Sequence, residues 1–128
     1  MKNKEIYSSA LNLLAQDPSE GANEDYEERA PYLIATFCNE ITEIDNAVRK
    51  ALGIEKKSEF DRVWLDLEEE FPMLDRFVSV AAKYLAAMLV IDEDTDLSDK
   101  LYEMYCDAIS AIRSQIPCII EKTANRYS

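Results

Sequence analysis

The sequence predicts an all-α protein, a small bundle of about four helices with a long second helix, in a single helical domain over residues 1–128. There are only two glycines in 128 residues, whereas β-folds need many turns, and turns with positive φ favour glycine or asparagine. Apolar residues recur at helical spacing over long stretches. Finally, Lys83 is the only charged residue between Phe77 and Asp92, so a helix formed there must be covered on most sides.

The first half of the chain contains two expected helices. Apolar spacing predicts the first over residues 4–16, and proline and glycine predict a loop over residues 17–23. A single apolar stripe predicts the second helix from Tyr26 to Leu52. Asn23 is its expected N-cap and Gly53 its expected C-terminal stop.

The second half begins with an ambiguous segment. Residues 54–70 fit a helical face or a short alternating strand, and we favour a short helix or an irregular segment. We expect Trp64 to be a packing anchor rather than a ligand platform. The third helix is predicted from about Pro72 to Ile91, because proline suits a first helical turn. The fourth is predicted to start near Asp96 to Ser98.

Two prolines interrupt the helical pattern, because proline lacks an amide donor and clashes with the preceding turn. Pro31 predicts either a kink or a late start of the second helix. Pro117 predicts a kink or an end of the fourth helix near Gln115–Ile116. The polar tail over residues 122–128 is expected to fray or reach outwards.

Composition excludes several classes of active site. The chain has no histidine, which removes the commonest general base and the commonest transition-metal ligand. The odd, widely spaced cysteines Cys38, Cys106 and Cys118 indicate reduced thiols rather than a zinc site. Cys38 is expected to be buried, since it lies on an apolar helix face. We therefore expect no enzyme activity, no catalytic residue, no cofactor and no metal site.

The acidic run after the third helix is the best candidate for a metal motif. Four of its carboxylates fall at positions 1, 3, 5 and 12 of a calcium loop, namely Asp92, Asp94, Asp96 and Glu103. However, Leu97 replaces the glycine of the sharp turn, and Lys100 stands where a ligand or water is needed. We favour the alternative, a helix–helix connection whose acids cap the fourth helix.

The remaining charge pattern indicates a solvated surface. A second acidic cluster consists of Asp66, Glu68, Glu69 and Glu70, and acid–base work would require one of these groups to be desolvated. The net charge of −12 disfavours nucleic acid and anionic membranes as partners. The apolar run Val78–Ile91 is shorter than the roughly 20 residues that span a bilayer. The first residues do not read as a signal peptide, so we expect a cytoplasmic protein.

Two features predict contacts between elements or subunits. Small residues on the third helix would let a neighbouring helix come close, within the subunit or between subunits; they are Ser79, Ala82, Ala86 and Ala87. The seven tyrosines suit core edges, and some of them suit subunit contacts.

The order of these features resembles the small helical adaptor proteins of the head–tail connector in tailed bacteriophages. A short helix precedes a loop with proline and glycine, and a long helix carries Arg29-Ala30 near its start. An acidic stretch then ends in Phe71-Pro72-Met73-Leu74-Asp75-Arg76-Phe77. The apolar helix containing residues 81–90 follows, and an acidic connection leads to Leu101-Tyr102-Glu103-Met104-Tyr105.

The resemblance implies a structural virion protein of a phage or prophage. Identical subunits would form a ring between the portal protein and the tail or stopper proteins, first in the host cytoplasm and then in the virion. DNA would pass the channel without specific binding, and an acidic wall would not hold it. The family implies no active-site residues. The alternative reading is a cytoplasmic acidic helical interaction module, or an inhibitor of a basic partner protein.

Overall fold

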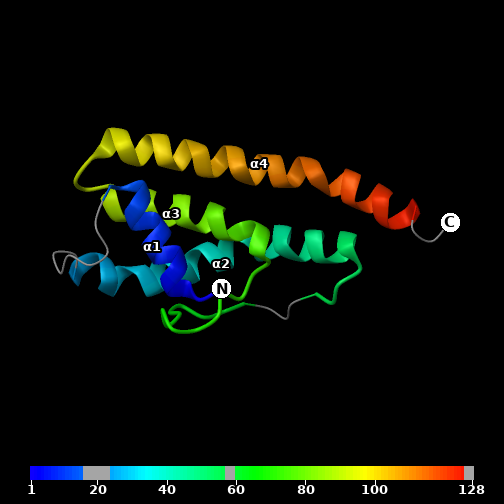
Figure 1. The fold of residues 1–128 in the computed structure, drawn as a ribbon, viewed down its shortest axis with the longest axis horizontal. Helices are drawn as coiled ribbons and strands as arrows, with labels where there is room; N and C mark the ends of the chain where they lie inside the picture. The colour runs from blue at the N-terminus through cyan, green and yellow to red at the C-terminus, as the bar shows by residue number, and fades with distance from the viewer. Residues whose placement is uncertain (16–23, 57–59, 126–128) are drawn as a thin grey trace.

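The computed structural model describes residues 1–15, 24–56 and 60–125, with side chains as far as residue 122. It contains the predicted helices α1 (Asn3–Leu13), α2 (Glu24–Leu52), α3 (Val78–Val90) and α4 (Thr95–Asn125), as Figure 1 shows. A short 3₁₀ helix, η1 (Asp75–Phe77), precedes α3. The all-α class and the long second helix, of 29 residues, are confirmed. The expected loop over residues 17–23, its N-cap Asn23 and the end of the polar tail lie outside the described residues.

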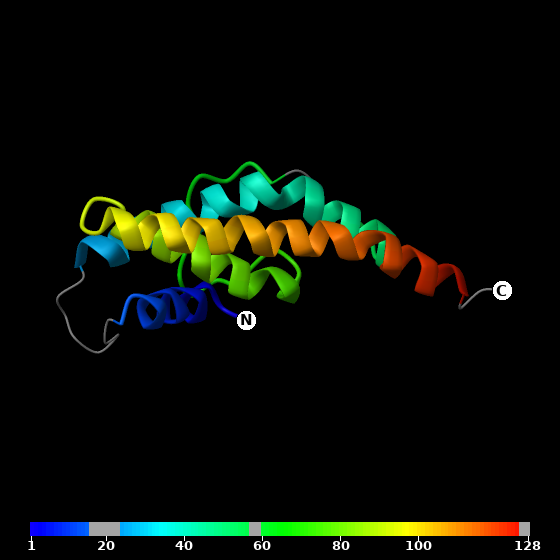
Figure 2. The same cartoon turned by 90° about the horizontal axis from the view of Figure 1, so that it is seen from above.

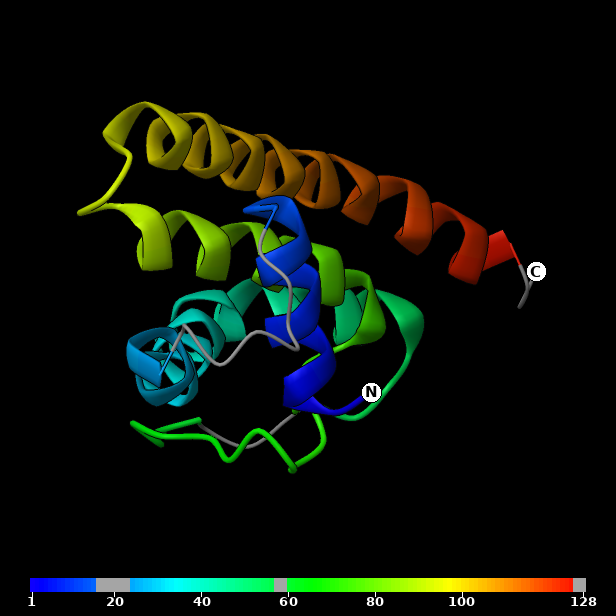
Figure 3. The ribbon, with the colours of Figure 1, turned by 60° about the vertical axis from the view of Figure 1, so that its left-hand side comes forward.

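Helix α3 contacts α1, α2 and α4, and its contacts with α4 and α1 are the most extensive in the protein. Helices α2 and α4 run in the same direction, and α3 runs in the opposite direction beside them (Figure 1). Helix α1 packs across α3, as Figures 1 and 3 both show. Nine of the 13 residues of α3 are buried, namely Val80, Ala81, Ala82, Tyr84, Leu85, Ala86, Ala87, Leu89 and Val90. The predicted cover around this apolar helix is therefore supplied largely by the rest of the same chain.

The small-residue face of α3 is used within the subunit. Ala82, Ala86 and Ala87 are buried, whereas Ser79 is exposed. The hydroxyl of the buried Ser98 on α4 donates a hydrogen bond to the carbonyl oxygen of Ala87 at 2.8 Å. This bond requires α4 to approach α3 closely, and a larger side chain in place of Ala87 would obstruct that approach.

Helix α3 begins later than predicted, so the expected start at Pro72 is wrong. Leu74 has an extended backbone, with φ −63° and ψ 149°, and the 3₁₀ turn follows it. Its amide N–H donates to Oδ1 of the buried Asp45 on α2 at 2.9 Å. Because a carboxylate from another helix satisfies this N–H, the chain is held extended here and the regular α-helix starts only at Val78.

Both prolines lie inside helices. Helix α2 starts at Glu24, before Pro31, so of the two alternatives for Pro31 the late start is wrong. Helix α4 continues through Pro117 to Asn125, so of the two alternatives for Pro117 the end near Gln115–Ile116 is wrong. Pro117 is exposed, and solvent can satisfy the carbonyl that loses its helical partner there.

The described part of residues 54–70 is irregular, one of the two conformations that we favoured, and it is bound to α1 and α2 by its backbone. The N–H of Lys4 donates to the carbonyl oxygen of Leu67 at 2.8 Å, and the N–H of Leu65 donates to that of Pro31 at 3.2 Å. Leu65 is buried. These bonds explain why the segment is ordered without a helix or strand of its own.

Two predictions about single side chains have opposite outcomes. Cys38 is fully buried, as expected. Trp64 is 41% exposed, so the prediction that it anchors the core is wrong. The neighbouring Leu65 is the residue of this segment that packs into the core instead. The aromatic core centres on Phe37, whose ring centroid lies 5.7 Å from that of Tyr84.

The end of α2 provides a test of backbone conformation. Gly53 has φ +73°, and the N–H of Ile54 donates to the carbonyl oxygen of Arg49 at 2.8 Å, which closes the helix end. A Cβ at Gly53 would meet no atom within 4 Å, so Gly53→Ala should cost about 1 kcal/mol through backbone strain alone. Ala15 also has positive φ, at 57°, and Ala15→Gly should not destabilise the protein comparably. Urea unfolding of both variants measures their free energies of unfolding, and equal destabilisation by the two substitutions would contradict this prediction.

The buried Asp45 provides a test of the start of α3. Its Oδ2 accepts a hydrogen bond from Arg49 Nε at 2.7 Å, and its Oδ1 accepts the Leu74 N–H. Asp45→Ala would leave both donors without this partner and should cost about 3 kcal/mol. Glu43→Ala, at an exposed position of the same helix, should change stability by less than about 0.5 kcal/mol. Urea unfolding should separate the two variants; equal effects would contradict the role given to Asp45.

Candidate interaction surfaces

The acidic connection between α3 and α4 acts as a helix cap. Asp94 Oδ1 accepts the N–H of Leu97 at 3.0 Å, and the carbonyl oxygen of Asp94 accepts the N–H of Ser98 at 3.0 Å. This is the capping arrangement that we favoured over a calcium loop. Within residues 1–15, 24–56 and 60–122, no group of three or more Cys, Asp or Glu side chains is arranged to hold a metal ion.

Two polar side chains of α2 bind the end of α3 and the connection that follows it, and no sequence pattern indicated these contacts. The hydroxyl of Tyr26 donates a hydrogen bond to Oε2 of Glu93. Arg29 Nη2 donates to the carbonyl oxygen of Met88 at 3.0 Å. Tyr26 is buried, and its burial together with the Glu93 carboxylate raises the pKa of its hydroxyl. The start of α2 is therefore attached to the end of α3, where a cation also stabilises the free carbonyls.

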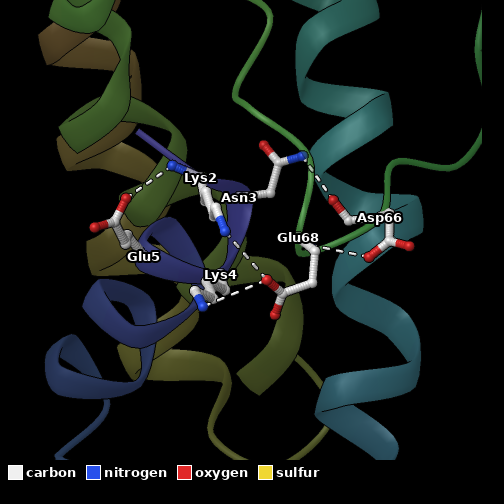
Figure 4. A network of polar contacts seen from close by, with 6 residues as sticks. All are labelled: Lys2, Asn3, Lys4, Glu5, Asp66 and Glu68. Atoms are coloured by element: carbon white, nitrogen blue, oxygen red, sulfur yellow. Dashed lines mark hydrogen bonds and ion pairs between the residues drawn. The ribbon is translucent and has the colours of Figure 1, made fainter.

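The second acidic cluster binds the start of α1, as Figure 4 shows. Glu68 Oε2 lies 3.5 Å from Lys2 Nζ and 3.4 Å from Lys4 Nζ. The Asn3 side-chain amide donates to the carbonyl oxygen of Asp66 at 3.0 Å. The carboxylate of Asp66 in turn accepts the N–H of Glu68 at 2.9 Å. The cluster is solvated, as expected, and it also joins two segments that are far apart in the sequence.

A bidentate ion pair holds the other side of this cluster. Arg62 Nη1 and Nη2 donate to Oε2 and Oε1 of Glu69 at 2.8 and 2.9 Å. The bonds from Arg62 lower the pKa of Glu69, and those from Lys4 lower the pKa of Glu68. Because the side chains of these pairs are 40–66% exposed, each pair stabilises the fold only weakly. Their effect is to position the segment rather than to hold the whole protein together.

The last part of α4 projects beyond the other helices, as Figures 1 and 2 show. Helix α4 has 31 residues, which corresponds to about 46 Å. Ile112 is its last buried residue within the side chains described. Ile116 and Ile119 are half-buried, and Ile120 is 53% exposed. We call residues 113–122 the α4 arm.

The tyrosines divide between core and surface. Tyr26, Tyr84 and Tyr105 are buried, whereas Tyr32 is 56% exposed and Tyr102 is 44% exposed. Tyr84 and Tyr105 lie 5.2 Å apart between ring centroids, and burial raises the pKa of Tyr84 to about 12. The exposed pair, with the α4 arm, supplies aromatic and apolar surface that suits protein contacts.

The described helices include none that is long and apolar enough to cross a membrane. The chain matches no family model, and neither curated proteins nor solved structures gave a significant match. Function is therefore inferred from the fold and from these surfaces.

Acidification should release the ion pairs of the second acidic cluster. The pKa values of Glu68 and Glu69 are lower in the folded chain than the ordinary value of about 4.3. Because the pKa of each group is lowered on folding, its contribution to stability is complete above the ordinary pKa. That contribution is lost as pH falls through the folded-state pKa. Side-chain carboxyl shifts followed by NMR should therefore titrate below the ordinary value. Lys4→Gln should move the Glu68 titration back towards it, whereas the Glu69 titration should stay in place.

Proposed function

We propose that this chain is a structural protein of a phage head–tail connector, which assembles as a ring of identical subunits between portal and tail. The observation that carries the proposal is the α4 arm, a helical projection on which Ile120 is 53% exposed and Ile116 and Ile119 are only partly buried against the core. The order of sequence features that resembles the connector adaptors supports the same reading.

The arm suits assembly for a physical reason. Apolar side-chain area gains about 25 cal/mol for each Å² removed from water. Ile120 and the exposed parts of Ile116 and Ile119 provide such area on one projection. A surface that docks on a different surface of an identical neighbour makes a head-to-tail contact, and repeated head-to-tail contacts form a ring when the rotation between neighbours closes. Because the end of α4 extends past the other helices (Figure 2), its exposed side chains can reach a neighbour without repacking the core.

The charge distribution suits a channel through which DNA passes. The net charge is −12, and the first turns of α2 expose four acids, Glu24, Asp25, Glu27 and Glu28. Such a surface repels phosphate and would not retain DNA. These same acids favour the second candidate, an acidic module that binds a basic partner protein. A connector gene should lie among portal, capsid and tail genes, whereas an inhibitor gene should lie beside that of its target.

The direct test mixes the purified chain with the portal protein encoded in the same genome and views the product by negative-stain microscopy. A ring of this protein on the portal is expected. No ring and no co-migration with the portal, even at high concentration, would overturn the connector proposal.

A charge on the α4 arm should prevent this assembly. Ile120→Asp should weaken portal-bound ring formation about tenfold or more, since burial of one large aliphatic side chain contributes roughly 1.5–3 kcal/mol. The same substitution should lower the free energy of unfolding of the monomer by less than about 0.5 kcal/mol, because Ile120 is exposed. Gln115→Asp places the same charge at another exposed position of the arm and should assemble normally. Analytical ultracentrifugation of each variant with portal protein measures ring formation, and urea unfolding measures the stability of the monomer. Normal assembly of Ile120→Asp would contradict the role of the arm.

A further inference from the structure

A surface cavity of about 540 Å³ lies between the starts of α1 and α2 and the irregular segment over residues 64–68. It brings together the exposed Trp64, which has no structural role in the fold described above, and part of the second acidic cluster. Backbone bonds shape it: the Lys4 N–H binds the carbonyl oxygen of Leu67, and the Leu65 N–H binds that of Pro31. The cavity is therefore formed before any partner arrives.

One side of the cavity is aromatic and apolar. Trp64 and Tyr7 both line it, together with Pro31 and Leu67. Trp64 remains 41% exposed, so its indole is open to an incoming group. Indole is the best aromatic surface for a cation, because its π face is electron-rich.

The charged groups of the cavity are mainly acidic. Four carboxylates line it, namely Glu5, Glu27, Asp66 and Glu68, against a single cation, Lys4. Lys4 is already paired with Glu68 at 3.4 Å. In the described part of the chain, no hydrogen bond or ion pair engages the carboxylate of Glu27, although its charge adds to burial in raising the pKa of Tyr7. A cation entering the cavity would thus meet an unused carboxylate beside an aromatic ring.

We propose that this cavity binds an arginine side chain presented by a segment of a partner protein. Guanidinium is planar, stacks on an aromatic face and donates two parallel hydrogen bonds to a carboxylate, whereas the lysine ammonium is a compact, strongly hydrated charge. The indole of Trp64 supplies the face and Glu27 supplies the carboxylate. The cavity is also larger than one such side chain, so residues flanking the arginine have room on the same surface.

The isolated chain is sufficient for the test, because Trp64 is its only tryptophan and reports on the cavity directly. The probe is the blocked tripeptide acetyl-Gly-Arg-Gly-amide, titrated at constant ionic strength. We expect a saturable change in tryptophan fluorescence and in the Trp64 indole N–H resonance, with a dissociation constant on the order of 1 mM. The same peptide with citrulline, which keeps the shape but lacks the charge, should give no saturable change.

Variants then assign the binding to the cavity. Glu27→Gln should weaken binding about three- to tenfold, through loss of the charge-assisted hydrogen bond. Glu28→Gln removes the same charge from the next residue of α2, which does not line the cavity, and should leave binding unchanged. Circular dichroism confirms that each variant is folded. Equal weakening by both variants, equal binding of the citrulline or lysine peptide, or no saturable change would overturn the proposal. None of these outcomes depends on ring formation or on the portal protein.

Discussion

The burial of α3 is the constraint on which the rest of the structure depends. Its side chains are almost all apolar or small, so water must be excluded around most of its circumference. Helices α1, α2 and α4 all contact it, and the bond from Ser98 to the carbonyl oxygen of Ala87 shows how closely α4 approaches. The two long helices also contact each other, and the short α1 crosses α3 (Figure 3).

Carboxylates position the elements around that core. The buried Asp45 holds the residues before α3, Asp94 caps α4, and Glu68 joins the start of α1 to the irregular segment. A strongly acidic chain thus uses some of its charges for local structure. Other acids, such as Glu27, remain on the surface, where they face solvent beside exposed aromatic rings. The acidic residues are therefore divided between local structure and the exposed surface.

Much of the fold could be predicted from local signals, whereas the candidate surfaces could not. The end of α2 at Gly53 could be predicted because it depends only on the backbone conformation of that glycine. The cap of α4 could be predicted because Asp94 lies within one turn of the amide that it binds. Trp64 was misassigned because its exposure depends on how residues 64–68 lie against α1 and α2. No spacing rule joins residues separated by so much chain, so neither the cavity nor the pairing of Glu68 with Lys2 and Lys4 could be derived from sequence.

The sequence by itself determined the all-α class, the long second helix, the buried Cys38 and the acidic cap of the fourth helix. Each depends on periodicity or on groups within a turn or two of one another. Tertiary structure alone decided where α3 begins, because the carboxylate of Asp45 on another helix holds the Leu74 N–H. It also decided that α4 continues past Pro117 into a projecting arm, since the exposure of a proline, and hence its cost to a helix, is set by what packs around it.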